Sequence, residues 1–214
     1  DIETRDDGKP VAFDVTYNIA EGVSVDGKLP KGLEQAQIAD ALGIASVSGE
    51  TTSGIAGEPS GALTMLAKLK EWLPELQTAH VSINENGMSL GAMTGAGVNT
   101  ALVSAGLEKD LGTDVKLDIR ASSLRPNSGA TRVNAATGQT ERFEYGAWLP
   151  KIDFAPSLST CGAQSDKVLA NAKINFLSGS ADLGPRSLRA INAMASVFGL
   201  CVRDAGLFVE IGGH

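Results

Sequence analysis

The side chains that could do chemistry in this sequence are few and lie far apart. Neither His80 nor His214 has another His, Cys or Asp at the spacing that a zinc site requires. Gly95-Ala96-Gly97 precedes a helix-like segment but lacks the third glycine and the acidic residue of a dinucleotide-binding loop. We therefore predict a protein that is not an enzyme and binds no metal or cofactor. His80 is predicted to be a surface or edge residue at the start of a strand.

One short segment has the character of a binding turn. Ser178-Gly179-Ser180 follows an apolar stretch and precedes a helix-like segment with Pro185 in its first turn. The first turn of a helix offers unpaired N–H groups and the positive end of the helix dipole, which suit a carboxylate. On these residues alone, a carboxylate site and a plain strand-to-helix connection fit the pattern equally well.

Composition limits the classes of partner. The 214 residues carry a net charge of −7, and 43% of them are hydrophobic, which is typical of a globular chain. The negative charge argues against nucleic acid and against electrostatic docking to anionic lipid. No stretch approaches the roughly 20 apolar residues that span a bilayer.

The first 120 residues contain a weak internal repeat. Gly22-Val23-Ser24-Val25 and Gly87-Met88-Ser89-Leu90 each follow a strand-like segment, which predicts two hairpins. A helix and then a closing strand are expected after each hairpin. The predicted helices span 33–42 and 98–111, and the closing strands 45–49 and 114–119.

A further helix is predicted between the two copies of the repeat. Its stripe of Ala62, Leu66, Leu69 and Leu73 is too short for a coiled coil and predicts a core face, and Pro74 should end it. After residue 122 the chain becomes irregular, with a hairpin expected around Thr137-Gly138 and a linker over 150–160.

The C-terminal segment resembles the first half of an OmpA-like peptidoglycan-binding domain. The resemblance rests on the strand-like Lys173-Ile174-Asn175-Phe176, the turn and helix that follow, and Leu207 to Ile211 ending in Gly212-Gly213-His214. It implies a βαβ half-domain, whose helix would pack an apolar stripe on the strands. That stripe consists of Leu188, Ile191, Ala195, Phe198 and Val202.

The resemblance also implies a ligand. Ser178, Gly179, Ser180 and His214 would form part of a site for the carboxylates of diaminopimelate in the peptidoglycan stem peptide. The family's Asp and Arg would follow His214, so these 214 residues alone should bind peptidoglycan weakly. The strand at 207–211 would have an unpaired edge, and self-association through it is expected.

Two cysteines, Cys161 and Cys201, lie in the same segment. In a cytosolic protein two lone thiols would most often be unpaired core residues, whereas in an envelope protein a disulfide is favoured. Because the resemblance implies the periplasm, we expect Cys161 and Cys201 to be bonded.

The repeat in residues 11–120 resembles a tandem of BON domains, which occur in bacterial envelope proteins. We therefore expect an α+β protein with three parts: a BON-like tandem (1–121), an irregular linker with a hairpin (122–160) and the OmpA-like half-domain (161–214). The implied function is non-enzymatic tethering of the envelope by peptidoglycan binding, in a periplasmic protein anchored to the outer membrane by a segment outside these residues. Alternatively, the BON-like part binds lipid or a protein partner and the OmpA-like part is only a tether.

Overall fold

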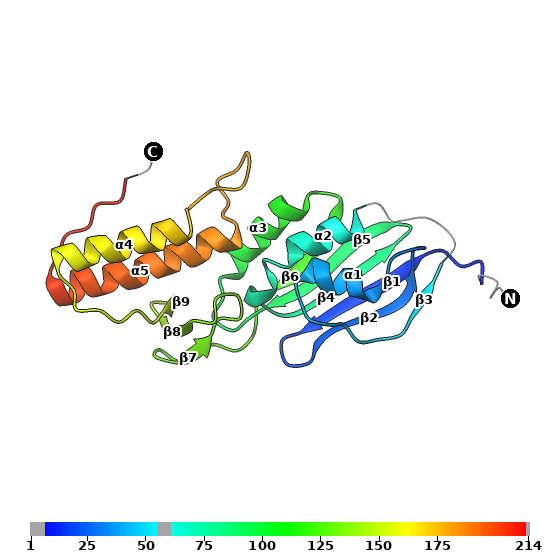
Figure 1. Ribbon diagram of the computed structural model, residues 1–214, viewed down its shortest axis with the longest axis horizontal. Helices are drawn as coiled ribbons and strands as arrows, with labels where there is room; N and C mark the ends of the chain where they lie inside the picture. Colours follow the sequence, from blue (N-terminus) through cyan, green and yellow to red (C-terminus); the bar gives the residue numbers. More distant parts are fainter. Residues whose placement is uncertain (1–6, 55–60, 213–214) are drawn as a thin grey trace. The chain divides into compact units, whose positions relative to one another are not determined.

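The computed structural model of the protein describes residues 7–54 and 61–212, and the fold is of the α+β class, as the sequence predicts. The chain divides into two compact units, Asp1–Ser123 and Leu124–His214, here called unit 1 and unit 2. Figure 1 shows the elements of both units in chain order.

Unit 1 is built on a six-stranded mixed sheet with the strand order β3-β2-β1-β4-β5-β6. Each hairpin is antiparallel, each third strand runs parallel to the second strand of its hairpin, and β1 pairs with β4 at the centre of the sheet. The strands are β1 (Ala12–Asn18), β2 (Gly22–Leu29), β3 (Thr51–Ser53), β4 (Leu76–Asn84), β5 (Gly87–Thr94) and β6 (Val115–Arg120).

The strand register shows that the sheet is an internal duplication. Asn18 pairs with Gly22 at the closed end of the first hairpin, and Asn84 pairs with Gly87 at the same place in the second. Superposing these ends matches Val15 with Val81, and these two residues pair with each other across β1 and β4. The two copies are therefore related by a pseudo-two-fold axis through this pair. The Gly-apolar-Ser-apolar segments occupy equivalent places in β2 and β5, as the repeat predicts.

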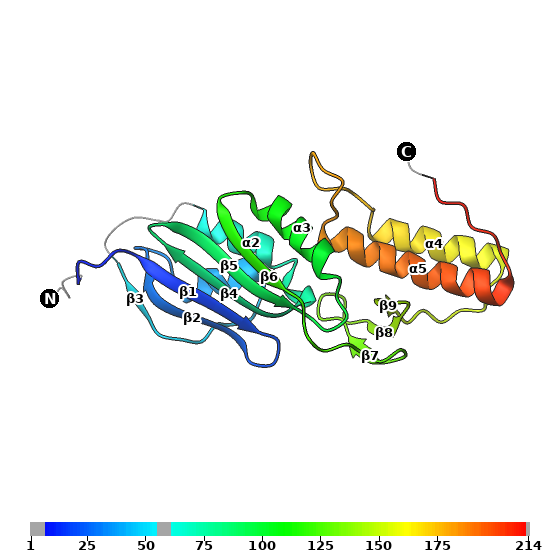
Figure 2. The ribbon, with the colours of Figure 1, turned by 180° about the vertical axis from the view of Figure 1, so that it is seen from behind.

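Three helices cover one face of the sheet, and Figure 2 shows the strands in front of them, viewed from the other face. The helices are α1 (Gln35–Leu42), α2 (Ala62–Leu69) and α3 (Thr100–Leu111). The predicted stripe of α2 is buried, because Leu66 and Leu69 have 0% and 1% of their surface exposed. Trp72, just after α2, is fully buried, and its indole Nε1 donates to Asp110 Oδ2 at 3.1 Å. Pro74 lies in a short 3₁₀ turn, Leu73–Glu75, beyond the end of α2.

One predicted strand of unit 1 lies later in the chain than expected. Residues 45–49 contribute only an isolated bridge between Ser48 and Ser24, and the strand that pairs with β2 is β3, at Thr51–Ser53. Gly49 has a φ of 104°, and a Cβ atom there would lie 2.2 Å from the carbonyl oxygen of Val25. The chain therefore crosses close over β2 before it pairs, which periodicity could not reveal.

Unit 2 combines a small sheet with two helices. Its elements are β7 (Thr131–Val133), β8 (Thr140–Glu144), β9 (Ala147–Pro150), α4 (Leu158–Asn171) and α5 (Pro185–Ala205). The hairpin around Thr137-Gly138 is confirmed by the pairing of β7 with β8. The helix α4 was not predicted. It begins inside the segment interpreted as a linker, at a capping box formed by Ser157 and Thr160.

The βαβ arrangement predicted for residues 161–214 is wrong. The stretch around Phe176 makes only one isolated bridge, to Leu183, and residues 207–211 form no strand. A strand needs a neighbouring strand to satisfy its N–H and C=O groups, and the described part of unit 2 supplies none beside these segments. The chain is held instead by other bonds: Ser187 Oγ bonds both backbone groups of Asn175, and Leu207 N–H donates to the Cys201 carbonyl.

The face of α5 that is buried also differs from the prediction. Ala190, Val197 and Cys201 are buried, whereas Ile191 and Val202 of the predicted stripe are 36% and 49% exposed. The helix turns its Cys201 side inward, where it packs on α4 and on the short strand β9. Ile191 and Val202 are consequently turned outward, whereas Phe198 of the predicted stripe packs against the buried cluster.

Candidate functional site

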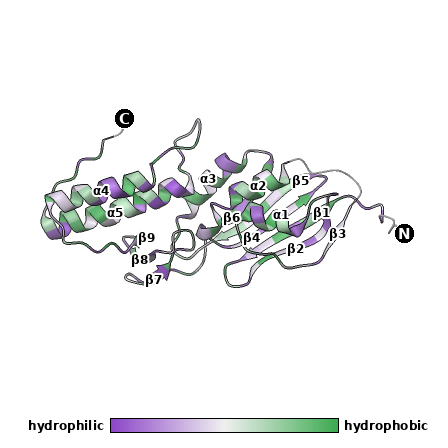
Figure 3. Ribbon diagram, in the orientation of Figure 1, coloured by the Kyte–Doolittle hydropathy of each residue, from purple (hydrophilic) through white to green (hydrophobic). Residues whose placement is uncertain are grey.

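The face of the six-stranded sheet that the helices leave uncovered is polar. Side chains alternate along each strand, so that Phe13, Val15 and Val81 point into the core and their neighbours point outward. Figure 3 shows this alternation of hydrophilic and hydrophobic residues along β1 and β2. The strand register arranges the outward residues in three rows across the sheet. The rows are Asp26-Asp14-Ser82-Ser89-Lys116, Ser24-Thr16-His80-Gly91-Asp118 and Gly22-Asn18-Thr78-Met93-Arg120.

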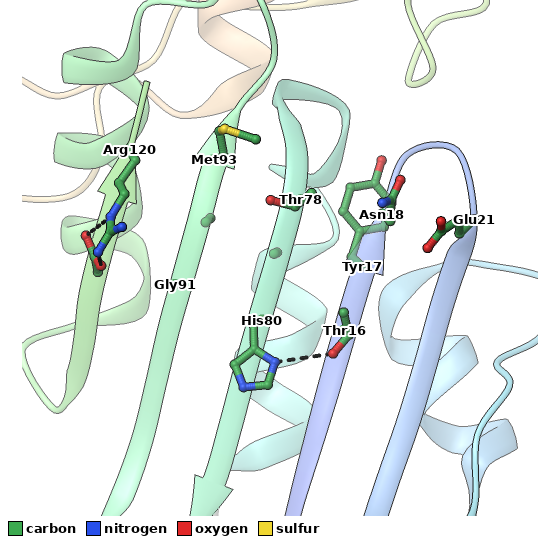
Figure 4. Close-up of a pocket in the computed structure, with 12 residues that line it drawn as sticks. Thr16, Tyr17, Asn18, Glu21, Thr78, His80, Gly91, Met93 and Arg120 are labelled. Atoms are coloured by element: carbon green, nitrogen blue, oxygen red, sulfur yellow. Dashed lines mark hydrogen bonds and ion pairs between the residues drawn. The ribbon is translucent and has the colours of Figure 1, made fainter. Parts of the chain in front are cut away.

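The middle row contains a hollow where Gly91 stands. Gly91 has no side chain, and a Cβ atom built on it would meet nothing within 4 Å. The open depression around it has a volume of about 510 Å³ and is drawn in Figure 4. It is lined by Thr16, Tyr17, Asn18, Glu21, Thr78, Ala79, His80, Gly91, Ala92, Met93, Asp118 and Arg120.

His80 is a surface residue, as predicted, but it lies at the centre of this face and not at the predicted start or edge of a strand. It belongs to the interior of β4, which begins at Leu76. Its Nδ1 is 3.2 Å from Thr16 Oγ1 and its Nε2 is 3.4 Å from Asp14 Oδ1, both on the neighbouring strand β1. The imidazole therefore bridges the two copies of the repeat while 57% of its side chain remains exposed.

On the other side of the hollow, Asp118 and Arg120 form an ion pair on the outer face of β6. Arg120 donates from Nε to Asp118 Oδ1 at 3.1 Å and from Nη2 to Oδ2 at 2.6 Å. These hydrogen bonds lower the pKa of Asp118 and raise that of Arg120, so both groups stay charged near neutral pH. The two charged groups are fixed as a bidentate pair with both donors and acceptors facing solvent.

Tyr17 borders the hollow on β1, but it shares the alternation of Phe13 and Val15, which face the core. It is partly buried, and burial raises the pKa of its phenol above the ordinary value of 10. The outward side chains around the hollow thus combine two threonine hydroxyls, an amide, an imidazole and a paired carboxylate and guanidinium.

The residues Gly87-Met88-Ser89-Leu90-Gly91 match the Gly-x-Ser-x-Gly letters of a hydrolase nucleophile elbow, a motif that sequence reasoning had wrongly taken to be absent. The elbow chemistry requires a sharp turn between a strand and a helix. Here the segment lies inside the regular strand β5, where Ser89 pairs with Ser82 and Lys116. The imidazole of His80 contacts Thr16 and Asp14 instead of Ser89. The match therefore gives Ser89 no activating base.

The turn predicted to bind a carboxylate is present before α5. Ser180 N–H donates to the Leu177 carbonyl at 3.0 Å, and Ser180 Oγ accepts from Asp182 N–H at 3.1 Å. Gly179 has a φ of 70°, which favours glycine, and Ser178 is exposed. Ser180 therefore stabilises the turn, which leaves Ser178 as its free polar side chain. His214, the fourth predicted site residue, lies outside the described residues.

The predicted disulfide is confirmed, and it joins Cys161 of α4 to Cys201 of α5. It was expected to join α5 to a segment before a strand, but that segment is the unforeseen helix α4. The bridge packs with Val197 against partly buried residues of both helices and of the segment after β9. These neighbours are Ile152, Phe154, Val168, Phe198 and Leu207.

Across residues 7–54 and 61–212, no cluster of three or more His, Cys, Asp or Glu side chains could hold a metal ion. Over the same residues, no helix is both long and apolar enough to cross a membrane. The chain matches no family model, no curated protein and no solved structure.

Proposed function

We propose that the protein is a non-enzymatic component of the bacterial cell envelope that binds peptidoglycan without covalent chemistry. In this proposal unit 2 belongs to an OmpA-like peptidoglycan-binding domain, and unit 1 is a BON-like tandem attached to it. The intact protein would sit in the periplasm and link its membrane anchor to the stem peptide.

The observation that carries the proposal is the disulfide between Cys161 and Cys201. Disulfides persist in oxidising compartments such as the periplasm and are rare in the cytosol. The bridge lies in a small buried cluster between α4 and α5, where Val197 is the other buried residue that the structure describes, so we expect the packing of these helices to depend on it. A protein built in this way suits the envelope, where the OmpA-like resemblance also places it.

The turn at 178–180 supports the stem peptide as ligand. It presents the exposed Ser178 in the segment that leads into α5, whose N-cap residue Gly184 contributes no side-chain cap. The start of a helix carries the positive end of the helix dipole, which favours a carboxylate nearby. The carboxylates of diaminopimelate are such groups.

The second candidate function assigns the binding to unit 1, with a lipid or a protein as partner. The observation that favours it is the uncovered polar face of the sheet, with its hollow at Gly91. In this case unit 2 would only tether the chain. Basic side chains on this face are few, and the chain carries a net charge of −7, so anionic lipid is a poorer partner than protein.

The test is co-sedimentation of the natural full-length protein with purified sacculi. Replacing Ser178 by Glu places a negative charge in the turn and should weaken binding at least about tenfold, because it repels the ligand carboxylate. The matched control is Ala163→Glu, which adds the same charge to the exposed face of α4 in the same unit. The control should bind as the unmodified protein does. Equal binding by both variants and the parent would contradict a site at the turn.

A further inference from the structure

The two copies of the repeat differ at several positions on the open face, and one of these differences creates the hollow. Matching the hairpin ends, as above, places Asp26 of β2 at the position of Gly91 in β5. Asp26 is already engaged, since its Oδ1 accepts from the Glu50 backbone N–H at 2.9 Å. In the second copy the side chain is missing and the space above the strand is open. The open space thus arises at the Gly91 position of the second copy, and side chains of both copies surround it.

The groups around the hollow come from four strands and offer both donors and acceptors. Thr16 and Asn18 project from β1, and Thr78 and His80 from β4. Asp118 and Arg120 present the fixed ion pair from β6. Met93 and the bare backbone at Gly91 add carbon surface from β5, as Figure 4 shows for the labelled side chains.

This mixture excludes several ligand classes. A phosphate or nucleotide would need uncompensated cations, but the guanidinium of Arg120 is engaged by Asp118, and Glu21 adds a negative charge to the rim. A lipid chain would need an enclosed apolar trough, whereas this depression is open and hydroxyl, amide, imidazole and charged groups stand around it. A ligand with many uncharged groups that both donate and accept hydrogen bonds meets the requirement.

We propose that the hollow over Gly91 is a binding site for a neutral saccharide. Sugar hydroxyls both donate and accept hydrogen bonds. Different hydroxyls of one saccharide can therefore bond the Asp118–Arg120 pair, Asn18 and the threonine hydroxyls. The C–H faces of a sugar ring would lie on the bare strand at Gly91 and against Met93. A volume of about 510 Å³ is within the range of small-molecule pockets.

The site lies wholly within unit 1 and does not rest on the proposed peptidoglycan site of unit 2. Failure of the saccharide test leaves the Ser178 experiment unaffected, and the converse also holds. The two experiments therefore separate two binding functions in one chain.

The test is titration of the full chain with two uncharged probes, an N-acetylglucosamine tetramer and a glucose tetramer, followed by amide chemical shifts. We expect shifts that saturate at millimolar ligand and are confined to the amides of β1, β4, β5 and β6 around the hollow. A response to both probes assigns the site to sugar rings in general, and a response to the first alone assigns it to acetamido sugars. Absence of any saturating shift with either probe would overturn the proposal.

The decisive variant is Gly91→Gln, which fills the hollow with a side chain. The open space at Gly91 lets the strand accept it without a clash. Affinity should fall at least about tenfold, or 1.4 kcal/mol. The matched control, Ser89→Gln, adds the same side chain two residues earlier on the same face, outside the hollow, and should bind as the parent does.

A second variant keeps the test independent of position 91. Arg120→Ala removes the exposed guanidinium and leaves the backbone of β6 in place, so affinity should again fall about tenfold. If Gly91→Gln and Arg120→Ala both bind the probe as tightly as the parent, the saccharide lies elsewhere and the proposal is wrong.

Discussion

Unit 1 and unit 2 are stabilised in different ways. The bulkiest fully buried side chains of the described residues, among them Phe13, Trp72 and Leu107, belong to unit 1. In unit 2 the buried apolar residues are few, and exposed ones such as Phe176, Phe208 and Ile211 are common. Unit 1 therefore holds its shape by burial of apolar surface, whereas unit 2 relies on one disulfide and on local hydrogen bonds.

This difference bears on function. The sheet of unit 1 is stabilised by the core on one of its faces, so its other face can remain polar and uncovered. The hollow lies on that other face. Unit 2 has few buried apolar residues, so its geometry depends on the disulfide between Cys161 and Cys201 and therefore on the redox state of its surroundings. We therefore expect the stability of unit 2, and not that of unit 1, to depend on an oxidising environment.

Among the substitutions that test this difference in stabilisation, Trp72→Ala should change the free energy of unfolding most. The indole is fully buried in unit 1 and bonds Asp110, so truncation leaves a cavity and a carboxylate without its donor. We expect a loss of about 3 to 5 kcal/mol in the free energy of unfolding of unit 1. Urea unfolding followed by signals from each unit measures it.

The control for that experiment is Trp148→Ala in unit 2. Trp148 is 7% exposed and contacts the ring of Phe143 and the guanidinium of Arg132. Its loss should destabilise unit 2 and leave the unfolding of unit 1 unchanged. If either substitution shifts both transitions equally, the two units do not have separate cores.

A smaller effect is expected from Ser157→Ala at the start of α4. Ser157 Oγ accepts from Thr160 N–H and Thr160 Oγ1 accepts from Ser157 N–H, so one substitution breaks the capping box. Unit 2 should lose about 1 kcal/mol, seen as a lower urea midpoint. Lys167→Ala, on the exposed side of the same helix, should change the midpoint little. A midpoint that stays unchanged in Ser157→Ala would show that α4 does not need its cap.

The smallest predicted effect is a change in the pKa of Asp118 on the open face of the sheet. Arg120 lowers the pKa of Asp118 below its ordinary value of 3.8, so the stability due to this pair is present above that pH and is lost as the pH falls through the lowered pKa. In Arg120→Gln the pKa of Asp118 should rise back toward 3.8. The pKa of Asp204 in unit 2, lowered by Arg203, should stay as it is. Carboxyl carbon shifts followed against pH report both groups, and an unmoved Asp118 would contradict the pairing.

The sequence predicted unit 1 better than unit 2, for physical reasons. In unit 1 the apolar residues are buried in a core, for example Val15 and Val81 in the strands and Leu66 and Leu69 in α2. Their periodicity in the sequence therefore predicts the strands and the helix correctly. The helix α4 has Cys161 as its only buried residue, and it therefore lacks a strong apolar period. In α5 the largest apolar residues are not the buried ones, because the disulfide sets which side faces α4.

The hollow could not be predicted from the sequence. Gly91 is one of 25 glycines in the sequence. Its role appears only when the strand register places it between His80 and Asp118, at the position that Asp26 occupies in the other copy. The cysteine pairing could be predicted, but only through the resemblance that implied the periplasm. The Gly-x-Ser-x-Gly letters can be read from the sequence, but the segment lies inside the regular strand β5 and therefore cannot form a nucleophile elbow.

The most direct test of the account is amide hydrogen exchange of the intact chain with and without a reductant. Closing the loop between Cys161 and Cys201, which are 40 positions apart, contributes about 4 kcal/mol in the chain-entropy model. We predict that reduction abolishes protection in α4 and α5 and leaves β1, β4 and β5 as protected as before. Unchanged protection of α4 and α5 after verified reduction would contradict the claim that unit 2 is built for an oxidising compartment.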